Sequence, residues 1–238
     1  MEEHGLRAGT NSATTLATRA FARLFVALTV WGGLLFWAAG TLRWGRAWIH
    51  LGIGVVTAAT NLMVLLWKNP DTVDARMKRQ KVGARFEVFM LPLFIPAVLA
   101  IPIIAGLDAV RYAWTSAPYW TIWPGIVVHV AGDALMLWAM VVNPHIEGAV
   151  RIQSERGHQV ITTGPYAIVR HPMYVGLILV LAGAPLLLGS GWAFLPIGIV
   201  CLGLVIRAAL EDRMLLKELP GYKAYARKTA YRLIPGVW

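Results

Sequence analysis

The densest group of chemically active side chains in this sequence lies at residues 162–176, which read TTGPYAIVRHPMYVG. Arg170 and His171 stand directly before a proline, and a tyrosine flanks them on each side, at Tyr166 and Tyr174. An arginine can orient a carboxylate through paired hydrogen bonds, and aromatic faces can hold a cation. The segment therefore suits a ligand that carries both a carboxylate and a cationic or flat aromatic part.

A second group of charged and aromatic residues lies at 206–228, which read IRAALEDRMLLKELPGYKAYARK. Arg207 and Glu211 are four residues apart and share one face of a helix, whereas Asp212 points about 100° away from Glu211. The letters ELPG at 218–221 predict the end of that helix. Taken alone, each feature is also typical of an ordinary surface ion pair or an interfacial anchor.

The two groups are separated by an apolar segment, Met173–Ile206, that contains no charged residue. A single helix of this length would run about 51 Å, well beyond the ~30 Å hydrocarbon core of a bilayer. The letters LGSGW at Leu188–Trp192 are typical of a turn. We therefore predict a helical hairpin of two membrane helices, which brings Arg170 and Glu211 to the same face of the membrane.

The rest of the chain also indicates a membrane protein. Only 14% of its 238 residues are charged, against about 25% in soluble domains. Four further apolar runs are each long enough for the ~20 residues that a bilayer core requires: Leu24–Leu42, Ala47–Trp67, Val88–Leu107 and Ile122–Val142. We predict an all-α fold: a polytopic integral-membrane bundle of about six membrane helices, the last two forming the hairpin, plus a C-terminal cytosolic helical segment.

The distribution of basic residues predicts the orientation. An even number of membrane helices puts both termini on one side, where tails and loops hold 19 Lys and Arg residues, against 3 on the other side. The positive-inside rule places both termini, and with them the two chemical groups, in the cytosol. We expect a single membrane domain, 1–238, with a flexible N-terminal tail at 1–20, a four-helix membrane part at 21–142 and a ligand-binding part at 143–238.

Charge and cysteine content argue against several other classes of protein. The net charge of +10 is spread between apolar runs, and not along one soluble face as nucleic-acid binding would require. Cys201 is the single cysteine, which excludes an intrachain disulfide and a cysteine-rich zinc site, and we predict no metal site. His129 and Asp133, four residues apart in an apolar run, are either a functional intramembrane pair or a structural polar contact.

The motifs together resemble those of a known family. TTGPYAIVRHPMYVG, followed one hairpin later by RAALEDRMLLKELPGYKAYARK and then LIP, is similar to the isoprenylcysteine carboxyl methyltransferase family. That family belongs to a wider group of integral-membrane methyltransferases that includes phospholipid methyltransferases. The shared pattern is a GPYxxxRHPxYxG block, an RxxxE(E/D) pair and a YxxY segment, and it covers roughly Asn143–Trp238.

The resemblance implies S-adenosyl-L-methionine as the methyl donor, bound in a pocket that faces the cytosol. It implies that activity depends on Arg170, Arg207 and Glu211. At Asp212 the chain has an aspartate where the family more commonly has a second glutamate. The positions that match the family's donor-binding residues are Gly164, Pro165, Tyr166, His171, Tyr174, Glu211 and Asp212.

The expected function is therefore methyl transfer to a lipophilic acceptor in the membrane, an isoprenoid or another lipid. A carboxylate acceptor needs no general base, whereas an amine or thiol would need one, for which Glu211 or His171 could serve. The expected partners are this lipophilic substrate and the membrane lipids, and no nucleic acid. The alternatives are a sterol-reductase-like enzyme that uses NADPH and a small transporter built around Asp133 and His129.

Overall fold

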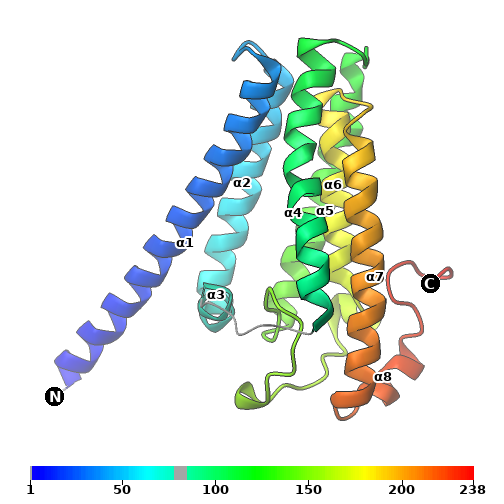
Figure 1. The fold of residues 1–238 in the computed structure, drawn as a ribbon. Helices are drawn as coiled ribbons and strands as arrows, with labels where there is room; N and C mark the ends of the chain where they lie inside the picture. The colour runs from blue at the N-terminus through cyan, green and yellow to red at the C-terminus, as the bar shows by residue number, and fades with distance from the viewer. Residues whose placement is uncertain (1, 78–84) are drawn as a thin grey trace.

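The computed structural model describes residues 2–77 and 85–238, and this part of the chain contains helices and no strands (Figure 1). Its α-helices are α1 (Glu2–Ala39), α2 (Gly45–Lys68), α3 (Pro70–Met77), α4 (Arg85–Gly106), α5 (Ile122–Val142), α6 (Pro172–Leu188), α7 (Phe194–Glu218) and α8 (Tyr222–Lys228). Within the described residues, five helices are long and apolar enough to cross a membrane: α1, α2, α4, α5 and α7. The apolar helix α6 is shorter, at 17 residues. The predicted all-α membrane bundle is confirmed, with five described helices of membrane-spanning length where the sequence predicted about six.

The apolar helices α6 and α7 form the predicted hairpin. Helix α6 begins at Pro172, because the missing N–H of proline is not needed in a first turn. It ends before Gly189, whose left-handed φ of +75° suits glycine. Helix α7 continues past the predicted boundary at Ile206 to Glu218. Arg207, Glu211 and Asp212 of the second group therefore lie on the same helix as the apolar run.

Helix α6 packs along α5 with direct contact between the two backbones. A methyl group added at Gly132 would lie 2.6 Å from the carbonyl oxygen of Gly176, and one added at Gly183 would lie 2.8 Å from that of Gly125. Lipid tails are as apolar as the side chains, so membrane helices associate through close packing, and small residues permit it. This contact sets the height of the first turn of α6, and hence of His171, relative to α5.

The first helix is longer than the sequence predicts. The apolar run Leu24–Leu42 indicates a membrane helix, and α1 contains most of it but begins at Glu2. The helix includes the tail at 1–20 from residue 2 on, and the flexibility expected of that tail stays a prediction. Helix α1 packs against α2 and α4, and its N-terminal part diverges from the rest of the bundle (Figure 1).

A short helix that the sequence did not predict, α3, lies beside the C-terminal end of α5. Asn69, just before α3, donates hydrogen bonds from its side-chain amide to the carbonyls of Met140 and Val141, at 3.2 and 2.7 Å. Thr72 donates its hydroxyl to the carbonyl of Pro144 at 3.2 Å. These bonds satisfy carbonyls at the end of α5 that lack partners within the helix.

At the end of the bundle where α6 stops, a buried carboxylate holds the loops together. Asp108, which is fully buried, accepts hydrogen bonds from the backbone N–H and hydroxyl of Thr115, at 2.8 and 2.9 Å. It also accepts from the Ser190 hydroxyl at 2.6 Å and from the Trp192 N–H at 3.1 Å. The turn of the hairpin is thus fixed to the segment after α4.

A buried arginine, Arg46, joins the segment before α5 to the end of α6. The Arg46 guanidinium lies 5.0 Å from the ring centroid of Tyr119 and donates to one hydroxyl and three carbonyls, those of Thr121, Ala117, Pro118 and Leu186. We call this region, built on Arg46, Asp108 and their partners, the closed end. Its two charges are solvated by neutral dipoles.

Candidate active site

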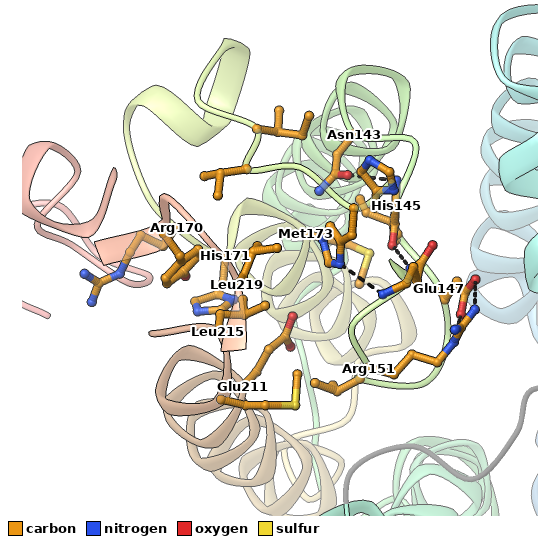
Figure 2. Close-up of a pocket in the computed structure, with 18 of the residues that line it drawn as sticks. Asn143, His145, Glu147, Arg151, Arg170, His171, Met173, Glu211, Leu215 and Leu219 are labelled. Carbon is orange, nitrogen blue, oxygen red and sulfur yellow. Dashed lines mark hydrogen bonds and ion pairs between the residues drawn. The ribbon is translucent and has the colours of Figure 1, made fainter. Parts of the chain in front are cut away.

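A pocket lies at the other end of the hairpin, where α6 begins (Figure 2). Its walls come from the loop 143–161, the segment 166–174, the last part of α7 and two tyrosines of α8. In Figure 2, loop side chains lie on one side of the cavity and side chains of α7 and of the start of α6 lie on the other. We call this region the pocket end. Segments that are far apart in the sequence therefore enclose one space.

The pocket brings together six of the nine residues that the sequence singled out: Tyr166, Arg170, His171, Tyr174, Arg207 and Glu211. Arg170 and Glu211, which come from opposite ends of the hairpin, line the same cavity. The remaining three, Gly164, Pro165 and Asp212, are not among its lining residues. The two groups therefore meet at one end of the helix bundle, as the predicted hairpin requires.

Tyr174 couples the start of α6 to α7. Its hydroxyl donates a hydrogen bond of 2.5 Å to the Glu211 carboxylate. Its ring is stacked on His171, with centroids 5.7 Å apart, and the Arg207 guanidinium lies 5.9 Å from its centroid. Arg207 also donates to the carbonyl of Gly148 at 2.7 Å. A carboxylate, a cation and two aromatic rings are therefore held next to one another in the wall.

Asp212, the next residue along α7, is fully buried behind the wall and does not face the cavity. Its carboxylate accepts hydrogen bonds of 2.9 Å from the Tyr222 hydroxyl and from Arg232. It also lies 3.0 Å from Nε of Arg170 and 3.7 Å from Nε2 of His171. A buried carboxylate is stable only when it is paired and hydrogen-bonded in this way. Asp212 therefore joins the start of α6 to the segment after α8.

Arg170 contacts α8 and the segment that follows it more than it contacts the cavity. Figure 2 shows its side chain directed away from Met173 and Glu211. Its Nη1 donates to the carbonyl of Ala226 at 3.3 Å, and its backbone N–H donates to the carbonyl of Tyr231 at 2.9 Å. These contacts position the C-terminal part of the chain, and the catalytic role expected of Arg170 stays a prediction.

Gly164 and Pro165 form a short helical turn that positions Tyr166. Gly164 has a left-handed φ of +59°, which favours glycine. The Tyr166 hydroxyl accepts a hydrogen bond of 3.1 Å from the Asn143 side chain, and its carbonyl accepts one of 2.7 Å from the Tyr225 hydroxyl. Burial raises the pKa of the Tyr166 phenol, so this group stays protonated at neutral pH.

The loop 143–161 supplies a wall that the motifs did not reveal. The Glu147 side chain is only 3% exposed and makes two hydrogen bonds to Arg151, at 2.8 and 2.9 Å. It also lies 3.6 Å from Arg156. The four-residue spacing of Glu147, Arg151 and Glu155 would indicate paired charges on a helix, but this segment is not an α-helix, so no local signal in the sequence marks this wall.

Two histidines pack against each other in this loop and line the pocket. The rings of His145 and His158 have centroids 4.7 Å apart. Burial lowers the pKa of both imidazoles, that of His158 to about 4, and His145 adds to the shift of its neighbour. Both rings are therefore neutral at pH 7.

His129 and Asp133 lie away from the pocket, in contacts between α5 and α2. Asp133 accepts a hydrogen bond of 3.1 Å from the Asn61 side chain. The His129 ring meets His50 edge-on, with centroids 5.7 Å apart. Neither residue is among the lining residues of the pocket. These contacts fit the structural interpretation of the pair.

Comparison with known proteins agrees with the motifs. Residues 125–217, from α5 to the end of α7, match the sequence model of the isoprenylcysteine carboxyl methyltransferase (ICMT) family. The resemblance to the ICMT family is therefore borne out over this part of the chain. The matched region contains the first charged group, the hairpin and the first part of the second group, as far as Lys217.

Two individual proteins match a larger share of the chain than the family model does. A solved structure described as the eukaryotic intramembrane Ras methyltransferase ICMT is 18% identical, covers 94% of this chain and 81% of that chain, and has a TM-score of 0.51. The nickel-cobalt-cadmium resistance protein NccN of Alcaligenes xylosoxydans xylosoxydans is 25% identical over 162 residues, which is 67% of each chain. The match to the ICMT family model and the ICMT-like fold together support a membrane methyltransferase activity.

Proposed function

We propose that this protein transfers a methyl group from S-adenosyl-L-methionine to a lipophilic acceptor in the membrane, an isoprenoid or another lipid, at the cytosolic face. One observation carries the proposal: the two charged groups at the ends of a membrane hairpin, represented by His171 and Glu211, line one pocket. The excess of Lys and Arg residues on that side, 19 against 3, supports the cytosolic orientation.

The residues in the wall fit the chemical groups of the proposed methyl donor. Arg207 suits its carboxylate, and Glu211 suits its cationic amino group. The stacked rings of His171 and Tyr174 offer aromatic faces to a sulfonium or an adenine ring. The donor, when bound, supplies an electrophilic methyl carbon.

The remaining task of the chain is to orient the reactants and exclude water, which is worth several kcal/mol in transfer reactions. Part of the pocket wall is apolar and includes Met173, Met214, Leu215 and Leu219, which suits a lipophilic acceptor. An amine or thiol acceptor would need a base, for which Glu211 or His171 could serve. A carboxylate acceptor needs no such base.

The proposal is tested by incubating the purified protein with a donor that carries a radiolabelled methyl group and with fractionated membrane lipids. We expect label to appear in one lipid fraction and to disappear from it with the Glu211→Gln variant. The Asp133→Asn variant should label that fraction as the unaltered protein does. If no fraction gains label, or if only Asp133→Asn prevents labelling, the proposal is wrong.

A binding measurement separates the donor from the nicotinamide cofactor of the sterol-reductase alternative. A ligand that binds only the folded state raises the unfolding temperature, and the increase grows with the ratio of ligand concentration to dissociation constant. We expect S-adenosylhomocysteine to stabilise the protein and NADPH to leave its unfolding temperature unchanged. Stabilisation by NADPH alone would favour the reductase.

A further inference from the structure

The surface formed by the C-terminal end of α7, by α8 and by the segment after α8 is strongly basic. Between Arg213 and Trp238 the exposed charged side chains are one acid, Glu218, and five cations: Arg213, Lys217, Lys223, Arg227 and Lys228. In α8, Lys223 and Arg227 are four residues apart and share the exposed face. The opposite face of α8 buries Tyr222 and Tyr225.

The segment after α8 returns to the level of the apolar part of α7. Leu233, only 4% exposed, belongs to the same buried cluster as Leu204 and Ala208 of that helix. The neighbouring side chains of Ile234 and Val237 are 56% and 74% exposed. Figure 1 shows this segment rising from α8 along the side of α7. Exposed apolar side chains therefore lie near the depth at which α7 becomes apolar, with the cations of α8 beyond them.

We propose that residues 222–238, which we call the C-terminal strap, dock onto anionic phospholipids of the surrounding leaflet. Lys223 and Arg227 contact the negatively charged headgroups, and Ile234 and Val237 enter the acyl region beneath. Basic side chains are attracted to an anionic membrane surface, and apolar side chains below them anchor the contact. The excess of cations selects an anionic lipid over a zwitterionic one.

The strap is bonded directly to residues of the pocket end. The backbone N–H groups of Arg170 and His171 donate to the carbonyls of Tyr231 and Arg232, both at 2.9 Å. The Arg232 side chain donates to Asp212. Lipid contact that orders the strap therefore also orders the residues behind the pocket wall. The inference concerns lipid binding and does not depend on methyl transfer, so its test uses no catalysis.

The test compares hydrogen exchange of the strap amides in two kinds of nanodisc, one of phosphatidylcholine alone and one that also contains anionic phosphatidylglycerol. We expect exchange at 222–238 to be at least about fivefold slower with the anionic lipid, which corresponds to one engaged basic side chain. Added salt should reduce this difference, because it screens exposed charges. Equal exchange in the two lipid compositions overturns the proposal.

Matched double variants identify the side chains responsible. Lys223→Gln with Arg227→Gln should abolish the dependence on anionic lipid. Arg19→Gln with Arg23→Gln removes two exposed cations at the same spacing on α1 and should preserve it. The opposite pattern, or loss in both variants, overturns the assignment to α8.

The apolar part of the proposal has its own variant. Ile234→Ser with Val237→Ser should speed exchange of the strap in both kinds of nanodisc. Amides of α6, measured in the same experiment, report whether the variant is still folded. If strap exchange is unchanged in a folded variant, these two side chains do not anchor the strap.

Discussion

The two ends of the α6–α7 hairpin both bury charged side chains, but they stabilise them in different ways. At the closed end, Asp108 accepts hydrogen bonds from hydroxyls and backbone N–H groups, and Arg46 donates to a hydroxyl and to carbonyls. At the pocket end, the carboxylates of Asp212 and Glu147 each lie within ion-pair distance of two arginines. The closed end uses neutral dipoles, and the pocket end uses opposite charges.

This difference shows that a buried charge does not by itself mark a functional site. The charges of the closed end connect loops, and Asp212 does the same work behind the pocket wall. The groups that suit chemistry are their neighbours that face the cavity, above all Glu211 and Tyr174. Each end can be perturbed separately to test this distinction.

The largest effect is expected for Asp212→Asn. This change leaves Arg170 and Arg232 without their negative partner, and breaking a buried pair costs several kcal/mol. Because the Arg232 side chain is 28% exposed, we expect a loss of about 3 kcal/mol in the free energy of unfolding. Chemical denaturation in detergent measures it, and methyl transfer should fall as well. Asp71→Asn, an exposed acid of α3, is the control and should change neither quantity.

The next effect is a loss of activity without a loss of stability. Glu211→Gln keeps an acceptor for the Tyr174 hydroxyl but removes the negative charge from the pocket wall. We expect the rate of methyl transfer to fall about 100-fold, the scale of a lost acid–base or charged contact, with an unchanged unfolding temperature. A comparable loss of stability would instead assign Glu211 to the scaffold.

The closed end should show the reverse pattern. Asp108→Asn replaces an acceptor of four hydrogen bonds with an amide that also carries donors, so at least one buried donor loses its partner. We expect the free energy of unfolding to fall by about 1–3 kcal/mol and the rate of methyl transfer per folded molecule to stay the same. Reduced activity at full stability would mean that the closed end influences the pocket directly.

The smallest effect is a pH dependence of stability that is confined to the loop 143–161. The pKa of His158 is lowered to about 4 in the folded protein and is about 6.5 when unfolded. The loop is therefore most stable above pH 6.5 and loses stability as the pH falls toward 4, because the unfolded loop takes up protons first. The protection of the loop amides, expressed relative to the intrinsic exchange rate at each pH, should fall over this range. The fall should be weaker in His158→Gln, and amides around Ser190 should not share it.

Much of the fold could be predicted from the sequence because apolar runs and turn residues are local signals. The run Met173–Ile206 is too long for one span, and its central LGSGW stretch marks the turn. Pro172 marks the start of α6 in the same way. Together these signals were enough to bring Arg170 and Glu211 to one pocket.

The remaining features depend on contacts that no local pattern encodes. Asp108 and Ser190 are 82 residues apart in the sequence, and nothing near either residue indicates the other. The loop 143–161 has no hydrophobic period, so its place in the pocket wall depends on tertiary packing. The direction of Asp212 could be expected from the helical repeat, but its partner Arg232 could not, because it lies in an irregular segment.

The backbone contact between α5 and α6 limits how this molecule can change shape. At Gly132 and Gly176 no side chain separates the two helices that could rotate aside, so this seam cannot widen without pulling the helices apart. Motions that admit or release a ligand therefore fall to parts joined to α6 through side chains and hydrogen bonds: α7, the loop 143–161 and the strap. The route of a long-tailed acceptor to Glu211 is best sought on the side of α6 that faces α7.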